Sequence, residues 1–370
     1  MNSKENNKKI KVLVLTKTLD ERCGWGRYSW NIVSRLIKRA DIQVLCLVEA
    51  TSQKGKYEEQ FFSVRYRPGS FLRMLLNLRK KIKTADVVHC FEGYPYAIFF
   101  FLAALGLRRK KLFINGIGTY TVKPLSHPLK KILLSAVYRR ASKIFCISSY
   151  TASRLSFYLP ELKNIEVVHM GNDFRATDNL SDGKTSNQSP VIISVGAIKA
   201  RKGQLDSVQA VKLLLPRYPD LQLNIVGDIN SQNYYQHITS FIKENNLNAN
   251  VHFYQQLTDQ ELQEHYAKAD IFLMPSTSRG ENFEGFGLVY LEAAVFGVPS
   301  IGCLETGAID AIKDGESGYL VPQDSPAEIA SAVVKIFEGD YQKMSAAAVA
   351  WSQNFDWDKT VARYYESYLL

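Results

Sequence analysis

Short apolar runs, with helical stretches between most of them, constrain the fold of this chain more than any other feature of its sequence. The runs are nearly continuous, as in parallel strands whose two faces are both buried. Strands that alternate with helices are typical of doubly wound sheets, so we predict the α/β class. The runs cover residues 10–15, 42–48, 87–91, 111–115 and 143–148 in the first half and 221–228 and 271–275 in the second half, which opens with another at Val191.

Two domains are expected, because 370 residues are enough for two separate cores. The polar stretch 176–190, ATDNLSDGKTSNQSP, is rich in Ser, Asn and Asp and is the expected linker. It separates a Rossmann-like domain at 1–175 from a second one at 191–354. The last segment, 355–370, is expected to form an amphipathic helix with aromatic anchors.

The net charge of +10 is divided unequally between the two halves of the chain. Residues 1–175 hold 32 Lys and Arg against 12 Asp and Glu, whereas residues 176–370 hold 14 against 24. We expect the basic half to meet an anionic partner, for which acidic lipids, polyanionic glycans and nucleic acid are the candidates. The alternative is a lysine-rich surface that serves solubility alone.

Two predicted helical segments of the basic half combine apolar residues with clusters of basic ones. They are 71–83 (FLRMLLNLRKKIK) and 127–140 (HPLKKILLSAVYRR). Helices that lie on membrane surfaces have this composition, so these segments are the candidates for contact with an anionic membrane. An apolar stripe on a helix also packs on a sheet, and the sequence leaves both interpretations open.

The five cysteines and six histidines lack the spacing of a metal site, and we expect no metal ion. An odd number of scattered cysteines favours a reducing compartment, and hence the cytoplasm. The longest apolar run, 97–107, is too short to cross a bilayer. The polar start of the chain, MNSKENNKK, lacks the apolar core of a signal peptide. We therefore expect a cytoplasmic protein that meets the inner face of the membrane peripherally.

The stretch 280–300, GENFEGFGLVYLEAAVFGVPS, carries the strongest functional pattern. Seven residues separate Glu284 from Glu292, and Phe286 and Gly287 lead directly into an apolar helical run. A helix that begins near Gly287 directs unpaired N–H groups and the positive end of its dipole outward, which favours a phosphate. Two carboxylates beside this helix end suit a ligand with a central diphosphate and hydroxyls on either side.

A second anion site is expected where the strand that starts at Val191 ends. The loop after this strand contains Lys199, Arg201, Lys202 and Gly203. Three cations at the carboxyl end of a strand can bind phosphate oxygens, and the glycine lets the backbone approach a ligand closely. A solvated basic turn is the alternative.

The string EGFGLVYLEAAVFGVPSI resembles the signature of the retaining family 4 glycosyltransferases, nucleotide-sugar enzymes with the GT-B fold. The resemblance implies two Rossmann-like domains that face a central cleft, with the terminal helix packed back on the first domain. It also implies that Glu284 contacts hydroxyls of the donor sugar and that Glu292 binds the ribose. The amides of Leu288 and Val289 are then expected to hold the diphosphate, together with Lys202, which matches a lysine of the family.

The resemblance also places substrate contacts at turns of both domains. The loop that carries Gly24 and Gly26 is expected to approach the donor phosphates and the acceptor. Thr119 is expected beside the donor sugar. The nucleobase is expected near the two turns that hold Gly227 and Leu257.

Two positions depart from the pattern of the family. Ala197 stands where an arginine is usual, so Arg201 or Lys199 has to supply the second charge for the diphosphate. Ile117 stands where many members carry a histidine that reaches the donor sugar, and His127 is the candidate replacement.

Together these features predict a metal-independent, retaining glycosyltransferase of the hexosyltransferase type. The expected donor is a nucleotide sugar with UDP or GDP as its nucleotide, and no cofactor is expected. Glu284, Lys202 and Arg201 are the expected catalytic residues, because two cations and a helix N-terminus stabilise a departing diphosphate. The expected acceptor is a lipid-linked or anionic glycan of cell-envelope or polysaccharide synthesis, and no nucleic acid is expected.

Two other functions stay open on the sequence alone. One is a different sugar-nucleotide enzyme on the same fold, such as an epimerase or a hydrolase. The other is a non-catalytic basic module that binds a membrane or nucleic acid. Ala197 and Ile117 favour this module, whereas Glu284, Glu292 and Lys202 argue against it.

Overall fold

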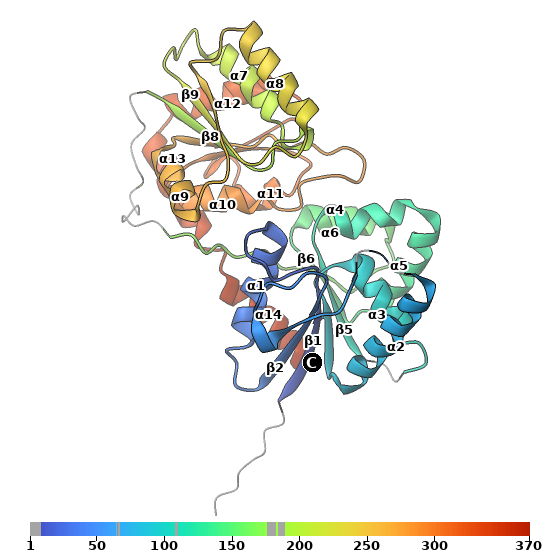
Figure 1. The fold of residues 1–370 in the computed structure, drawn as a ribbon. Coiled ribbons are helices and arrows are strands. Elements are labelled where there is room, and N and C mark those ends of the chain that lie inside the picture. The colour runs from blue at the N-terminus through green and yellow to red at the C-terminus, as the bar shows by residue number, and fades with distance from the viewer. Residues whose placement is uncertain (1–8, 64, 66, 108–109, 176–182, 184–188) are drawn as a thin grey trace, which may run out of the picture. The chain divides into compact units, whose positions relative to one another are not determined.

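The structure is a computed structural model that describes residues 9–63, 65, 67–107, 110–175, 183 and 189–370. The chain forms two compact units (Figure 1). The first unit is Met1–Met170 with Trp357–Leu370, and the second is Gly171–Asp356. Most of the expected linker at 176–190 lies outside the described residues.

The first unit contains a parallel sheet with the strand order β3-β2-β1-β4-β5-β6-β7. Strand β1 pairs with both β2 and β4, so that Leu15 lies level with Leu47 and with Cys90. Chain order reverses at β1, and the connections therefore run over both faces, as in doubly wound folds. The strands are β1 (Ile10–Leu15), β2 (Ile42–Val48), β3 (Glu58–Gln60), β4 (Val87–Cys90), β5 (Lys111–Gly116), β6 (Lys143–Cys146) and β7 (Ile165–Val167).

Helices cover both faces of this sheet (Figure 1). On one face Leu13 of β1 shares a buried core with Leu78 and Tyr138, which come from two different helices. The helices are α1 (Gly24–Leu36), α2 (Pro68–Thr84), α3 (Ile98–Ala103), α4 (Thr119–Val122), α5 (Pro128–Arg140), α6 (Ser149–Tyr158) and α14 (Trp357–Leu369), with short turns η1 (Gly55–Tyr57), η2 (Gly93–Ala97) and η3 (Lys123–Ser126).

Helix α14 comes from the end of the chain and packs on the first unit beside α1. Its Tyr368 hydroxyl lies 2.6 Å from Nδ1 of His89 in β4, and Nε2 of the same ring lies 2.7 Å from Oδ1 of Asn115. Burial lowers the pKa of His89 to about 3, so the ring is neutral and accepts one hydrogen bond while donating the other. These polar contacts inside an aromatic core fix the position of α14.

The second unit contains a parallel sheet with the strand order β10-β9-β8-β11-β12-β13. Its strands are short and apolar, and the helices α7, α8, α12 and α13 share a buried core with one face. The strands are β8 (Val191–Val195), β9 (Gln222–Val226), β10 (Val251–Tyr254), β11 (Ile271–Leu273), β12 (Ser300–Cys303) and β13 (Gly318–Val321). The helices are α7 (Gln204–Leu214), α8 (Gln232–Glu244), α9 (Asp259–Lys268), α10 (Leu288–Val295), α11 (Ala308–Ala311), α12 (Pro326–Glu338) and α13 (Tyr341–Ser352), with the turn η4 (Ala200–Lys202).

The predicted fold class is confirmed, since both units are α/β with a parallel sheet. Helix α9 follows the turn that holds Leu257, and Thr258 and Glu261 form a capping box at its start. Helix α1 begins at Gly24, because the Cys23 side chain caps it by accepting from the Gly26 N–H. The edge strands β3 and β7 were not predicted, because each has three residues and neither is an apolar run.

Candidate active site

A basic turn follows the first strand of the second unit, as predicted. Strand β8 ends at Val195, and η4 carries Arg201 and Lys202 into α7. Gly203, which joins η4 to α7, has a φ of 72°, and a Cβ there would lie 2.1 Å from the carbonyl oxygen of Pro275. Only glycine fits this left-handed position and close approach. The cations are therefore held against the chain that leaves β11.

The two cations of this turn bind the carboxylate of Glu284. Oε2 of Glu284 accepts from Lys202 Nζ at 2.6 Å and from Arg201 Nη1 at 2.9 Å. We call these three residues the carboxylate–cation cluster. The side chains of Lys202 and Glu284 are 12% and 13% exposed, so water screens the contacts only weakly. Burial opposes ionisation of Glu284, but the charges and hydrogen bonds of the two cations outweigh it and lower its pKa to about 2.

Helix α10 begins at Leu288, shortly after Glu284 in the chain. Gly287 caps the helix with a φ of 85°, and a Cβ there would lie 2.4 Å from the ring of Tyr290. Phe286 is buried, and the first two helical residues, Leu288 and Val289, are half-buried. The N–H groups of a first helical turn have no carbonyl partner within their helix and form a partial positive charge. The predicted helix start at Gly287 is confirmed.

Glu292 lies inside the second unit rather than on its surface. It belongs to α10, is 6% exposed, and accepts a hydrogen bond of 3.0 Å from the Tyr266 hydroxyl of α9. A buried carboxylate needs such partners to offset its desolvation. The tyrosine holds the Glu292 side chain in a fixed orientation.

A pocket of about 510 Å³ lies beside the basic turn in the second unit. Lys199 and Arg201 line it, together with Asp206, Arg279 and Asp324. Burial, and then the charges of Arg201 and Lys202, lower the pKa of Lys199. Burial, and then the charge of Asp324, raises the pKa of Asp206 to about 6. The pocket therefore gathers charges of both signs next to the carboxylate–cation cluster.

The predicted nucleobase contacts lie in two turns of the second unit. Gly227 follows β9, and its N–H donates to the Tyr254 carbonyl at 2.9 Å. Leu257 is half-buried in the turn between β10 and α9. Ala197 lies in the turn after β8, where its carbonyl accepts from Gln204 at 3.2 Å. The substrate contacts expected at Gly227 and Leu257 stay predictions.

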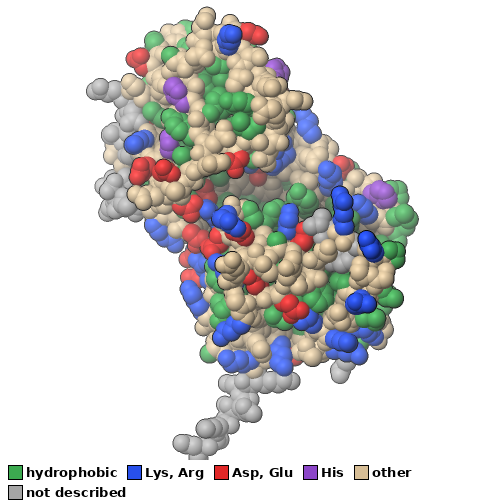
Figure 2. Space-filling model, viewed as in Figure 1, with side chains coloured by type: hydrophobic (Ala, Val, Ile, Leu, Met, Phe, Trp, Pro, Cys, Tyr) green, Lys and Arg blue, Asp and Glu red, His purple; other side chains and the backbone are tan. Residues whose placement is uncertain are grey.

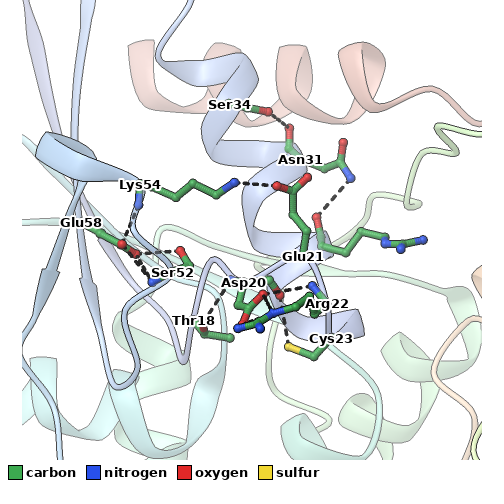
Figure 3. A network of polar contacts seen from close by, with 11 residues as sticks. Thr18, Asp20, Glu21, Arg22, Cys23, Asn31, Ser34, Ser52, Lys54 and Glu58 are labelled. Carbon is green, nitrogen blue, oxygen red and sulfur yellow. Dashed lines mark hydrogen bonds and ion pairs between the residues drawn. The ribbon is translucent and has the colours of Figure 1, made fainter. Parts of the chain in front are cut away.

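In the first unit, side-chain contacts fix the long loop between β1 and α1 (Figure 3). The carboxylate of Asp20 accepts hydrogen bonds from the Arg22 side chain, the shortest at 2.6 Å, and from the Arg22 backbone N–H. These hydrogen bonds lower the pKa of Asp20 to about 2. The Cys23 thiol donates to the Asp20 carbonyl at 3.4 Å, and Lys54 pairs with Glu21 at 2.6 Å. This construction differs from the tight glycine turn of a dinucleotide fingerprint.

The fixed loop leads to the other predicted residues of the first unit. Gly24 is the exposed first residue of α1, and Gly26 is buried two residues later. Between them, the ring of Trp25 meets that of Tyr120 edge to face, with centroids 5.2 Å apart. Thr119 precedes this tyrosine as the first residue of α4. Gly24, Gly26 and Thr119 thus flank one aromatic pair, and their predicted substrate contacts are untested.

The aromatic pair borders a second pocket of about 510 Å³, which we call the first-unit pocket. Its walls include His127, the proposed replacement for the family histidine, whereas Ile117 is half-buried at the end of β5. The residues that define this pocket are Trp25, Glu49, Glu92, Tyr94, Tyr120 and Lys130.

Glu92 is the most perturbed acid of the first-unit pocket. It follows β4, is 7% exposed, and its Oε1 has no hydrogen-bond partner among the described residues. Burial raises its pKa to about 8; the charge of Lys17 opposes this shift and the charge of Glu49 adds to it. At neutral pH the side chain is mostly an uncharged acid that can donate a hydrogen bond. No sequence pattern predicted this acid.

Within the part of the chain that the structure describes, no group of three His, Cys, Asp or Glu side chains could hold a metal ion. The chain has one D-x-D triplet, Asp356-Trp357-Asp358. Its tryptophan is buried at the start of α14, and Asp358 pairs with Arg35 at 2.9 Å.

Family profiles match nearly the whole chain. The profile "Glycosyltransferase Family 4" matches residues 23–175, and the profile "Glycosyl transferases group 1" matches residues 177–351. The chain belongs to glycosyltransferase family 4. The predicted family is thereby confirmed, and the two profiles meet at the junction where the sequence predicted a linker.

Curated family members are similar over part of their length. A GDP-mannose-dependent alpha-(1-6)-phosphatidylinositol monomannoside mannosyltransferase of Mycolicibacterium smegmatis is 28% identical over 251 residues, which are 64% of this chain and 64% of that protein. A D-inositol 3-phosphate glycosyltransferase of Paenarthrobacter aurescens is 29% identical over 58% of this chain and 53% of that protein. The chain thus matches less than two thirds of the length of each.

Solved structures share the fold over almost the full chain. HepE of Anabaena in complex with UDP superposes with a TM-score of 0.78 at 18% identity and covers 96% of this chain and 99% of its own. The lipopolysaccharide outer core galactosyltransferase WaaB superposes with a TM-score of 0.75 at 17% identity. The match covers 97% of this chain and 99% of the WaaB chain. These likenesses confirm the predicted GT-B fold.

The sequence predicted the charged residues of the candidate site but not the residues that hold them. Met274 accepts a 3.2 Å contact from Lys202 through its sulfur, and Tyr290 donates to the Met274 carbonyl at 2.6 Å. Tyr266 holds Glu292. These partners lie on different elements, and an apolar strand end or a helical tyrosine carries no signal of such a role.

Proposed function

We propose that this family 4 protein transfers a sugar from a nucleotide-sugar donor to the hydroxyl of an acceptor, with retention of configuration and without a metal ion. The carboxylate–cation cluster beside the start of α10 carries the proposal. A diphosphate leaving group needs positive charge, and two cations with a helix N-terminus supply it. This charge makes a metal ion unnecessary, and the donor is a substrate, so no cofactor is proposed.

Donor binding is proposed to exchange the partners of the cations. In the protein without donor, Glu284 forms ion pairs with Lys202 and Arg201. The diphosphate takes over both cations and the N–H groups of Leu288 and Val289. Glu284 then accepts hydrogen bonds from hydroxyls of the donor sugar. After this exchange Arg201 supplies the second positive charge for the diphosphate, which Ala197 cannot supply.

The transfer step forms one bond and breaks another at the anomeric carbon. The acceptor oxygen bonds to that carbon while the bond from carbon to phosphate oxygen breaks. The electron pair of the broken bond stays on the diphosphate, which receives the proton of the acceptor hydroxyl. Attack from the side of the leaving group retains the configuration, and the cations stabilise the charge that develops on the diphosphate.

The donor nucleoside is assigned to the far end of the same site. Glu292, oriented by Tyr266, is proposed to bind the ribose hydroxyls, with the base near Gly227 and Leu257. UDP and GDP are the proposed nucleotides. The name of the mycobacterial relative specifies GDP-mannose, and the HepE structure contains UDP.

The acceptor is proposed to be a lipid-linked or anionic glycan of cell-envelope or polysaccharide synthesis. The 32 basic against 12 acidic residues of 1–175 support this, because excess positive charge attracts anionic ligands. The names of two relatives specify a phosphatidylinositol mannoside and an inositol phosphate. A sugar of the hexose type is proposed as the transferred group.

We also propose that the first unit rests on an anionic membrane surface. Both α2 and α5 bury one apolar stripe on the sheet, yet α5 leaves Leu129 and Ile132 70% and 67% exposed, and α2 leaves Leu72 59% exposed. Figure 2 shows apolar side chains among lysines and arginines at the edge where α5 lies. Apolar side chains with a basic rim suit the interface of an anionic bilayer. None of the helices in the described part of the chain has the length and hydropathy of a membrane span.

The protein is proposed to act in the cytoplasm. All five cysteines are unpaired, and four of them are buried. Unpaired cysteines are typical of proteins in a reducing compartment.

Thermal unfolding in the presence of UDP, GDP or ADP tests the donor site. A nucleotide at 100 times its Kd stabilises the folded protein by about 2.7 kcal/mol, which raises Tm measurably. We expect one nucleotide to raise Tm, and Lys202→Ala and Glu292→Ala to reduce that rise. Lys243→Ala, which removes an exposed lysine of α8, is the matched control. If no nucleotide changes Tm, the donor site is absent and a non-catalytic function of the basic unit takes its place.

A further inference from the structure

Aromatic side chains line one part of the first-unit pocket. Trp25 and Tyr120 meet edge to face with centroids 5.2 Å apart, and Tyr120 is 53% exposed. Tyr94 adds a third ring. Aromatic faces pack well against the C–H faces of sugars, because these faces are apolar while the hydroxyls point sideways. A volume of about 510 Å³ lies within the range of small-ligand pockets.

Two carboxyl groups provide hydrogen-bonding capacity in the same pocket. Glu49 is oriented by the Tyr96 hydroxyl, which donates to its Oε2 at 3.2 Å. Glu92 is buried, lines the pocket, and leaves Oε1 without a hydrogen-bond partner among the described residues. A buried polar atom without a partner is destabilising, and a ligand hydroxyl would supply the missing hydrogen bond. Two carboxyl groups in one pocket suit a ligand with several hydroxyls.

The remaining charged groups of the pocket are cationic. Lys17, Lys123 and Lys130 line it, and Lys130 Nζ lies 4.8 Å from the centre of the Tyr94 ring. Lys130 belongs to the first turn of α5, whose cap residue His127 makes no side-chain hydrogen bond to the helix end. The N-terminus of this 13-residue helix adds a partial positive charge to the lysines. Three lysines and a helix N-terminus face two carboxyl groups, so the pocket favours an anion.

We propose that the first-unit pocket binds the acceptor as a phosphate-bearing sugar, with the ring against Trp25 and Tyr120, the phosphate at Lys123, Lys130 and the start of α5, and hydroxyls at Glu49 and Glu92. The proposal rests on the proposed transferase function and specifies its acceptor. Glu92 is a positioning residue here: it holds a hydroxyl and takes no part in bond making. The phosphate belongs either to a free sugar phosphate or to a lipid-linked sugar, and the two share this chemistry.

Direct binding to the full-length protein, in the absence of donor, tests the proposal. The probes are glucose 1-phosphate, glucose and inorganic phosphate, measured by isothermal titration calorimetry with saturation-transfer NMR for weak binding. We expect glucose 1-phosphate to bind at least ~10-fold more tightly than glucose or phosphate, because it uses both ends of the pocket. A version with a dodecyl chain on its phosphate distinguishes the sources: tighter binding indicates a lipid-linked sugar and equal binding a free sugar phosphate.

Variants locate this binding in the first unit. Tyr120→Ala and Lys130→Ala are expected to weaken glucose 1-phosphate binding ~10-fold, whereas Lys163→Ala, at an exposed lysine of the same unit, leaves it unchanged. Lys202→Ala should also leave it unchanged, since it alters the second unit. Glu92→Ala is expected to weaken binding ~10-fold and Glu92→Gln to restore it, because the amide keeps a hydrogen-bond donor.

Three outcomes would overturn the proposal. Glucose that binds as well as glucose 1-phosphate would make this a site for neutral sugars. Phosphate alone that binds as well would make it an ion site without a sugar. Binding lost in Lys202→Ala but kept in Tyr120→Ala would place the ligand in the second unit. Since nucleotide-induced stabilisation depends on Lys202, failure here and failure of the donor site are separate results.

Discussion

Replacing Glu284 with glutamine tests whether the carboxylate–cation cluster is charged as the structure indicates. The Glu284→Gln side chain keeps the shape and one oxygen acceptor but loses the negative charge. Lys202 and Arg201 then lie side by side without an anion. We expect the variant without ligand to be less stable than the wild type at pH 7. In the wild type the negative charge of Glu284 offsets the two positive charges, and the variant lacks it.

The size of the effect follows from the pKa of Glu284. Its fall from 4.5 to about 2 on folding corresponds to about 3 kcal/mol at pH 7, at roughly 1.4 kcal/mol for each pKa unit. A pKa that is lower in the folded state stabilises the fold above the unfolded pKa. This stabilisation is lost as the pH falls from about 4.5 toward 2. By pH 3.5 the wild type should have lost about 1.4 kcal/mol of this contribution to its free energy of unfolding, whereas the variant lacks the contribution at every pH.

Urea unfolding at pH 7, 5 and 3.5, followed by tryptophan fluorescence and circular dichroism, measures this difference. The difference in unfolding free energy between wild type and Glu284→Gln should be largest at pH 7 and shrink toward pH 3.5. Glu328→Gln, at an exposed acid of α12, is the control and should follow the wild type. Equal losses in wild type and Glu284→Gln would refute the charged cluster.

Three further changes have definite outcomes. Gly287→Ala places a methyl group 2.4 Å from a tyrosine ring at a φ of 85°. It should lower the free energy of unfolding in urea by about 2–4 kcal/mol and weaken nucleotide binding. The same change at exposed Gly69 of α2 is the control and should not destabilise the protein. Tyr368→Phe removes a hydrogen bond to a buried histidine and should cost about 1–3 kcal/mol and speed proteolysis at α14; unchanged proteolysis would count against the fixing of this helix. The double change Leu129→Ser and Ile132→Ser should weaken sedimentation with vesicles of 30% anionic lipid about tenfold or more, and unaltered sedimentation would exclude α5 as the membrane contact.

The sequence predicted the fold because its strands are buried on both faces. Continuous apolar runs such as those of β1 and β2 have the same bounds in the sequence pattern and in the structure. It also predicted the start of α10, since Gly287 precedes an apolar helical run. Three-residue edge strands such as β3 escaped prediction because they are half-buried and carry no apolar run.

The arrangement of the charged groups was less predictable than their presence. Lys202 and Glu284 are 82 positions apart, and only the folded sheet brings them within 2.6 Å. The sequence suggested hydroxyl binding for Glu292 but gave no sign of its hydrogen bond to Tyr266. Glu92 carries no motif at all; its perturbed pKa comes from burial in a pocket whose walls are assembled from several loops and helices.

The most direct test of the proposed transfer is the release of nucleoside diphosphate from UDP- and GDP-sugars, followed over time with and without a panel of phosphate-bearing acceptors. We expect one donor to be consumed only when an acceptor is present and a glycosylated acceptor to form in equal amount. We expect Lys202→Ala to lose the reaction. Consumption without acceptor, with free sugar as the product, would indicate a hydrolase. No consumption of any donor would contradict the transferase assignment itself.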